Sequence, residues 1–137
     1  MAKTFTAPFA QAPKTGIAVS TTATASIDTT PTNTTLLVTA GADGALVTRL
    51  WAIPRATVTA TTLYLFLSKD GGTTLRLVDT ELMAAHTVAT TTAIPETSFG
   101  NYSESTPFRL EAADRLYVGV GVTLSNGIVF KAEFTDF

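Results

Sequence analysis

The side chains that could carry out chemistry are few in this sequence. It contains one histidine, His86, and no cysteine. Zinc and other transition metals are bound in proteins mainly by histidine and cysteine, so a metal site here would need an unusual set of carboxylates. A Ser-His-Asp triad that uses Asp79 can be drawn, but the G-x-S-x-G turn of many serine hydrolases is absent. We therefore interpret His86 as a surface or interface residue and predict no catalytic residue.

The acidic residues do not suggest an active site either. Carboxylates lie close together in sequence in the pairs Asp79 and Glu81, Glu111 and Asp114, and Glu133 and Asp136. A glycosidase needs two carboxyl groups that face one another across a cleft. Each pair here falls in a predicted turn or on a solvent-facing edge, so we interpret the pairs as solvated surface charge. The turns Asp43-Gly44 and Asp70-Gly71-Gly72 could lend oxygens to calcium, but neither has the ligand density of an EF-hand loop. The sequence predicts no enzyme, no metal and no cofactor.

Composition and charge narrow the range of partners. The 137 residues carry nine basic and eleven acidic side chains, a net charge of −2, spread evenly along the chain. A basic cluster that could drive binding to nucleic acid or to an anionic membrane is absent. No apolar stretch approaches the ~20 residues that span a bilayer, and the N-terminus lacks the apolar core of a secretory signal. We expect a protein made in a cytoplasm, whose low-charge surface suits burial in an assembly.

The elements that would position these residues are predicted to be strands. Roughly a fifth of the chain is threonine, a β-branched residue that favours extended backbone. The stretch 57–78 is the most apolar: Leu63, Leu65 and Leu67 lie on one side of a strand, and Tyr64 and Phe66 on the other. A strand that is apolar on both faces is usually covered on both. The Asp70-Gly71-Gly72 turn then leads into a second strand, which gives a central hairpin.

The rest of the chain follows the same pattern. Further strands are expected over 17–27, 34–40, 46–53, 87–94, 107–111, 116–124 and 128–134. In the third of these, simple alternation places Val47, Trp51 and Ile53 on one face. A helical turn is expected over 79–86, with Asp79 as N-cap, and Asn126-Gly127 is expected to form a hairpin turn. We predict an all-β protein, an antiparallel β-sandwich of about eight strands over residues 17–137, with an extended N-terminal arm over residues 1–16.

Three segments are candidates for contacts with other molecules. The arm carries Phe5, Pro8, Phe9 and Pro13, and is either a frayed terminus or an arm that docks on a neighbouring copy. The loop 95–107 carries Phe99, Asn101 and Tyr102, which either form a recognition loop or plug an end of the sandwich. In the strand 116–124, Gly119 and Gly121 leave bare backbone on one face. An aromatic ring such as Phe130 or Tyr117, or a partner subunit, is expected to lie across them.

The segment 107–122, PFRLEAADRLYVGVGV, resembles the penultimate strands of jelly-roll domains. Together with the Thr/Ala-rich arm and the segment LLVTAGADGALVTRLWAIPRATVTATTLYLFLSKDGG, it makes the chain similar to small virion proteins of tailed bacteriophages, most of all to the head-decoration (capsid cement) type. The resemblance implies a jelly-roll homo-oligomer, most often a homotrimer. Such a protein is made in the host bacterial cytoplasm and sits on the outer capsid surface of the virion, where major capsid subunits meet.

By this resemblance the protein stabilises contacts between major capsid subunits and does no chemistry. The arm, with Phe5, Pro8, Phe9 and Pro13, would clamp neighbours, and Tyr64 and Phe66 become candidates for a subunit contact on the sheet face. Two other functions stay open. A receptor- or carbohydrate-binding jelly roll of a tail fibre would use Trp51, Phe99, Asn101 and Tyr102. A tail or neck structural protein is the other.

Overall fold

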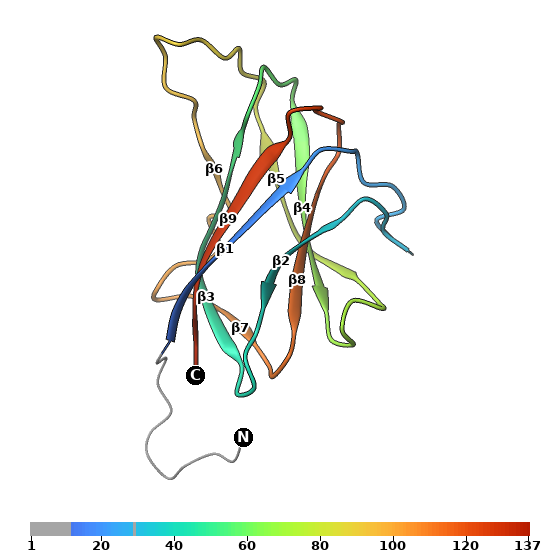
Figure 1. Ribbon diagram of the computed structural model, residues 1–137, viewed down its shortest axis with the longest axis vertical. Coiled ribbons are helices and arrows are strands. Elements are labelled where there is room, and N and C mark those ends of the chain that lie inside the picture. Colours follow the sequence, from blue (N-terminus) through green and yellow to red (C-terminus); the bar gives the residue numbers. More distant parts are fainter. Residues whose placement is uncertain (1–11, 29) are drawn as a thin grey trace.

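The computed structural model describes residues 12–28 and 30–137, which form two antiparallel β-sheets packed face to face (Figure 1). In chain order the strands are β1 (Ala12–Ser20), β2 (Thr35–Thr39), β3 (Ala45–Pro54), β4 (Thr61–Ser68), β5 (Arg76–Met83), β6 (Thr97–Ser98), β7 (Phe108–Leu110), β8 (Arg115–Val120) and β9 (Ile128–Asp136). The first sheet has the order β1-β9-β3-β6, with β7 also paired to β3, and the second has the order β2-β8-β4-β5. No helix occurs in this part of the chain, so the prediction of an all-β sandwich is confirmed.

The strand pairs are nested along the chain. The innermost pair is β4 with β5, the next is β3 with β6 and β7, then comes β2 with β8, and the outermost is β1 with β9. The pairs β3–β9 and β4–β8 then join these ribbons into the two sheets. The predicted hairpin at 57–78 is confirmed as the innermost pair, with Gly71 and Gly72 at positive φ in its turn.

The core lies between the two sheets and follows the period of two along the strands. In β9 the side chains of Ile128, Phe130, Ala132 and Phe134 all face inward and are buried. In β4, Leu63 and Leu65 are fully buried opposite Val120 and Val118 of β8. Side chains at the intervening positions therefore face outward, onto the outer faces of the sandwich.

A β-bulge in β3 changes which side chains reach those outer faces. The register between β3 and β9 shifts between Val47 and Arg49, so Thr48 is an extra residue in the ladder. One extra residue moves every later side chain to the opposite face. Val47 therefore packs in the core, whereas Trp51 lies outside it, opposite Lys131. The prediction that Val47 and Trp51 share a face is wrong for this reason.

Two predicted strands end early, since β1 stops at Ser20 and not at residue 27, and β8 stops at Val120 and not at residue 124. Four other local predictions are wrong. Residues 79–86 form no helical turn, because Asp79 to Met83 continue β5 and pair with β4. Residues 87–94 form no strand, and are joined by a single bridge between Ala89 and Thr92. The turn at Gly127 does not close a hairpin, because β8 and β9 belong to different sheets.

The fourth concerns the N-terminal boundary. Residues 12–16 were expected in the arm, but they belong to β1, where Pro13 lies opposite Thr135. Proline fits there because β1 is the outermost strand of its sheet and no further strand needs an N–H from it. Phe5, Pro8 and Phe9 lie outside the described residues.

Candidate functional site

His86, the only histidine in the sequence, is held by its backbone. Its N–H donates to the Val58 carbonyl at 3.0 Å, and its carbonyl accepts from the Val58 N–H at 2.9 Å. The side chain is half-buried. Across the described ranges 12–28 and 30–137, no three His, Asp or Glu side chains come together in a way that could hold a metal ion. None of these residues belongs to a helix that could cross a membrane.

Two of the six paired carboxylates are buried, so their interpretation as solvated surface charge is wrong. Asp114 accepts a hydrogen bond from the Glu111 N–H at 2.9 Å and from Lys69 Nζ at 2.9 Å. The bond to Asp114 is the main cause that raises the pKa of Lys69. Asp136 accepts from the Gly41 N–H at 3.1 Å and pairs with Lys14 at 2.6 Å. Both carboxylates close turns and strand ends at one end of the sandwich.

The Asp70 turn is also a structural unit. Its carboxylate accepts from the Thr74 N–H at 2.8 Å and from the Ser68 hydroxyl at 3.0 Å, and that hydroxyl in turn accepts from the Gly72 N–H at 2.8 Å. These hydrogen bonds lower the pKa of Asp70, and the bond from Thr74 makes the largest contribution. The bonds from Thr74 and Ser68 are both accepted by Oδ1 of the carboxylate, which therefore closes the turn that joins β4 to β5.

The outer face of the second sheet is covered at its centre by another part of the chain. A side chain at Gly119 would overlap the Thr24 hydroxyl, and the Phe66 ring lies 3.5 Å from the same point. Thr24 belongs to the connection between β1 and β2, and its N–H donates to the Val120 carbonyl at 2.7 Å. Phe66, whose ring lies next to the same point, is 0% exposed. The predicted cover over Gly119 exists, but it comes from Thr24 and Phe66 and not from Phe130 or Tyr117.

This burial removes Phe66 as a subunit contact, because its ring is already enclosed within the protomer. Tyr64 is half-buried on the same face, with its hydroxyl 3.3 Å from the place that a Cβ at Gly121 would take. Tyr64 therefore remains available for a contact.

The outer face of the first sheet is covered differently. Trp51 is 6% exposed, but it is absent from the hydrophobic core cluster. The Arg49 guanidinium lies 3.9 Å from the centre of its ring, and Lys131 Nζ lies 5.0 Å from it. Arg49 also pairs with Glu96 at 2.9 Å and, more loosely, with Glu133 at 3.9 Å. Charged side chains thus cover the tryptophan.

The predicted recognition loop is anchored to the fold. Phe99 is buried in the core beside the middle of β3, so its ring packs inside the protein as the second alternative requires, but along the edge of the sheet and not at an end of the sandwich. The ring of Tyr102 packs edge-on against Phe108, with 5.3 Å between the ring centres. Burial, followed by its hydrogen bond to Asp79, raises the pKa of Tyr102. Asn101 donates to the same carboxylate at 3.4 Å. All three side chains therefore fix the loop in place.

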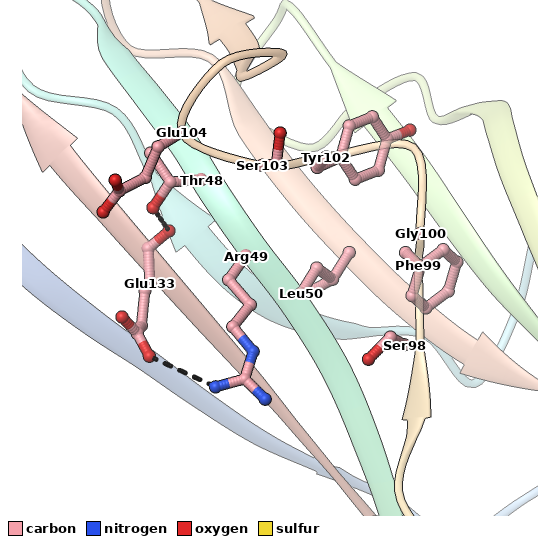
Figure 2. Close-up of a pocket in the computed structure, with 10 residues that line it drawn as sticks. All are labelled: Thr48, Arg49, Leu50, Ser98, Phe99, Gly100, Tyr102, Ser103, Glu104 and Glu133. Atoms are coloured by element: carbon pink, nitrogen blue, oxygen red, sulfur yellow. Dashed lines mark hydrogen bonds and ion pairs between the residues drawn. The ribbon is translucent and has the colours of Figure 1, made fainter.

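Beside this loop lies a shallow pocket of about 270 Å³ that opens to solvent. Its lining residues are Thr48, Arg49 and Leu50 of β3, Ser98 of β6, Phe99, Gly100, Tyr102, Ser103 and Glu104 of the following loop, and Glu133 of β9 (Figure 2). Figure 2 shows Arg49 and Glu133 on one side, Glu104 above them, and the loop on the other side. Of the predicted site residues, the pocket brings together Phe99 and Tyr102.

Sequence reasoning missed the charged side of this pocket. Alternation in the last strand does place Lys131 and Glu133 on its outward face, which is correct. The signal that links Glu133 to Arg49 is the pairing of β9 with β3, and a single sequence does not give that pairing.

Several aliphatic side chains are exposed on the outer faces. Ile17 is 64% exposed on β1, beside Val19, which lies in a row with Val129 and Ile53 across the first sheet. Leu82 is 67% exposed on β5 of the second sheet. Single exposed apolar residues are common, but rows of them indicate contact surfaces.

No protein family, no curated protein and no solved structure matches this chain.

Proposed function

We propose that this chain is a non-enzymatic structural protein of a tailed-bacteriophage virion. It binds the outer capsid surface as a homo-oligomer, a trimer, and stabilises the contacts between major capsid subunits. Added buried area across a joint between subunits raises the work needed to open that joint, without any chemical step. The proposal starts from the sequence resemblance to head-decoration proteins.

The strand order supports the jelly-roll part of the proposal. A jelly roll is two packed sheets built from one long antiparallel ribbon that is wound around itself. Such a ribbon pairs the first strand with the last, the second with the last but one, and so on inward. The nested pairs β1–β9, β2–β8, β3–β6/β7 and β4–β5 have this order when β6 and β7 are counted as one interrupted strand.

The observation that carries the assembly role is the exposed aliphatic surface on the outer faces. Ile17, Val19 and Leu82 lie on edge strands, where a neighbouring protein can reach them. Burial of one such side chain contributes roughly 1.5–3 kcal/mol to an interface. The net charge of −2 gives little self-repulsion against close packing of copies.

The experiment is a binding assay of the purified protein on capsids that lack it. We expect saturable binding at symmetry-related positions, and weaker binding of the Ile17→Ser and Leu82→Ser variants. The matched control is Val122→Ser, which changes an exposed aliphatic side chain outside the strands. Folded protein that leaves the capsids bare would overturn the proposal, and binding to purified tails in its place would favour a tail or neck role.

The four residues predicted for carbohydrate binding are already engaged within the fold. Trp51 and Phe99 are buried, and Asn101 and Tyr102 are held by Asp79. A glycan site built from those four side chains would need the loop to detach from the edge of the second sheet.

A further inference from the structure

The pocket on the outer face of the first sheet is a gap in that sheet. On the side of β3 away from β9, β6 pairs with Trp51 and Ala52, and β7 pairs with Ala45 to Val47. Between these two short pairings, no strand of residues 12–28 and 30–137 lies beside Thr48 and Arg49, and Leu50 is bonded there only to Phe99. The chain between β6 and β7 arches outward there, so the gap is open to solvent (Figure 2). The β-bulge at Thr48 lies at the same place, and bulges commonly re-aim side chains beside binding sites.

The wall of this gap is held in position before any ligand arrives. The Phe99 N–H donates to the Leu50 carbonyl at 2.9 Å, and Phe99 is buried. Farther along, the hydroxyls of Ser103 and Thr106 are 2.9 Å apart, and their backbones bond to one another in both directions. Tyr102, between these points, is packed on Phe108. A wall fixed in this way costs little entropy to order on binding.

The lining is polar and of mixed charge. Glu133 and Glu104 supply carboxylate oxygens, Arg49 supplies a guanidinium, and hydroxyls come from Thr48, Ser98 and Ser103. Arg49 and Glu133 are in loose contact at 3.9 Å and are not joined by a hydrogen bond, so each can still bond to a ligand. The two carboxylates outnumber the one guanidinium, so an anion would be repelled, and a simple cation would leave the hydroxyls and the guanidinium N–H groups of the lining without a hydrogen-bond partner. A neutral ligand rich in hydroxyl groups can donate to the carboxylates and accept from Arg49 without either penalty.

The volume restricts the size of that ligand. Pockets for drug-sized molecules measure roughly 300–1,000 Å³. At about 270 Å³ this pocket has room for one small ring, with any continuation left in solvent.

We propose that this gap, lined by Arg49, Glu104, Glu133 and the hydroxyls beside them, binds a single sugar residue of a glycan. The site is independent of the capsid role proposed above and uses none of the exposed aliphatic residues on which that role rests.

The test is a titration of the isolated full-length protein, followed by amide NMR shifts and by the fluorescence of Trp51, the single tryptophan, against which Arg49 stacks. The probes are glucose, galactose, mannose and N-acetylglucosamine, and the methyl glycoside of each, which mimics a residue within a chain. Inorganic phosphate and propylguanidine serve as anionic and cationic probes. We expect at least one sugar to bind, with shifts confined to the pocket, and neither charged probe to bind there.

Glu133→Gln should weaken sugar binding by about tenfold, and Glu104→Lys should abolish it. Both changes are made at exposed side chains, so folding is checked simply by thermal unfolding. The control Glu111→Gln removes a carboxylate that is 82% exposed and remote from the pocket, and should leave binding unchanged. Failure of every sugar to bind, binding of a charged probe in the gap, or sugar binding unaffected by Glu104→Lys would each overturn the site. None of these results bears on capsid binding, which is measured separately.

Discussion

Phe66 and Trp51 are both buried aromatic side chains on the outer face of a sheet, and they are covered in different ways. Phe66 lies on the second sheet under Thr24, beside the bare backbone of Gly119. Trp51 lies on the first sheet under the side chains of Arg49 and Lys131. A folded chain segment can leave only by local unfolding, whereas charged side chains change rotamer within nanoseconds.

This difference indicates on which outer face the side chains can rearrange when a ligand binds. The centre of the second sheet's outer face is closed by the side chain of Thr24, which lies over Gly119 and whose own backbone N–H is bonded to Val120, so it acts as an extension of the core. The first sheet's outer face is closed by side chains and has the pocket at its edge. The predictions below test this contrast, from the largest expected effect on stability to the smallest.

Phe66→Ala should be the most damaging change. It removes a fully buried ring, and changes of this kind cost about 3–5 kcal/mol of unfolding free energy. The measurement is equilibrium unfolding in urea. Tyr64→Ala, on the same face but half-buried, is the comparison and should cost clearly less. Equal effects of the two changes would mean that the chain does not cover Phe66 as described.

Gly119→Ala should cost about 1–3 kcal/mol, because the new methyl group would overlap Thr24 and overpack the contact. Its control is Gly100→Ala, since no atom lies within 4 Å of a Cβ placed there. We expect the control to be neutral or slightly stabilising by thermal unfolding. A neutral Gly119→Ala would show that the cover over the second sheet is loose, and the contrast with the first sheet would fail.

The variant Tyr102→Phe tests the contact between the loop that forms the pocket wall and Asp79 of β5. At neutral pH the lost hydrogen bond to Asp79 should cost about 1 kcal/mol. The pKa of Tyr102 in the folded protein is raised above its ordinary value of about 10, mainly by burial, so the contribution of Tyr102 to stability is present below that pH and is lost as the pH rises through the folded pKa. The stability of the native protein should therefore fall more steeply above pH 10 than that of the Phe variant. Parallel pH profiles from urea unfolding would argue against both the burial of the Tyr102 hydroxyl and its contact with Asp79.

Arg49→Ala should have the smallest effect on stability, about 1 kcal/mol or less. Its contacts are a cation–π stack on Trp51 and partly exposed ion pairs with Glu96 and Glu133, and both kinds are weak. Thermal unfolding measures the change. A loss as large as that of Phe66→Ala would show that Arg49 is part of the fold and not a removable cover.

Much of the fold could be predicted from the sequence because the strands alternate. The hairpin of β4 and β5 and the inward face of β9 follow from apolar periodicity and a Gly-Gly turn. Other features depend on contacts distant in sequence. The bulge at Thr48 moves the side chain of Trp51 to the opposite face of β3, and the local sequence pattern does not predict this bulge.

The same reason explains the errors at the candidate site. The strand predicted over 116–124 ends at Val120. The Gly121 N–H still donates to the Thr62 carbonyl at 2.8 Å, but the Val122 N–H donates to the Thr61 hydroxyl at 3.0 Å and not to a backbone carbonyl. The strand identity of residues 79–83 comes from pairing with β4, which outweighs their local helical pattern. The pocket itself exists because β6 and β7 pair with separate parts of β3, and only the folded chain brings its charged and hydroxyl groups together.

The most direct test of the contrast between the two faces is acrylamide quenching of Trp51 fluorescence in the double variant Arg49→Ala, Lys131→Ala. If charged side chains cover the ring, removing both should raise the quenching constant about twofold or more while the protein stays folded. The control Arg76→Ala, which removes an exposed cation from the second sheet, should leave quenching unchanged. Quenching equal to that of the native protein would contradict the account, because it would mean that Trp51, like Phe66, is enclosed by the chain itself.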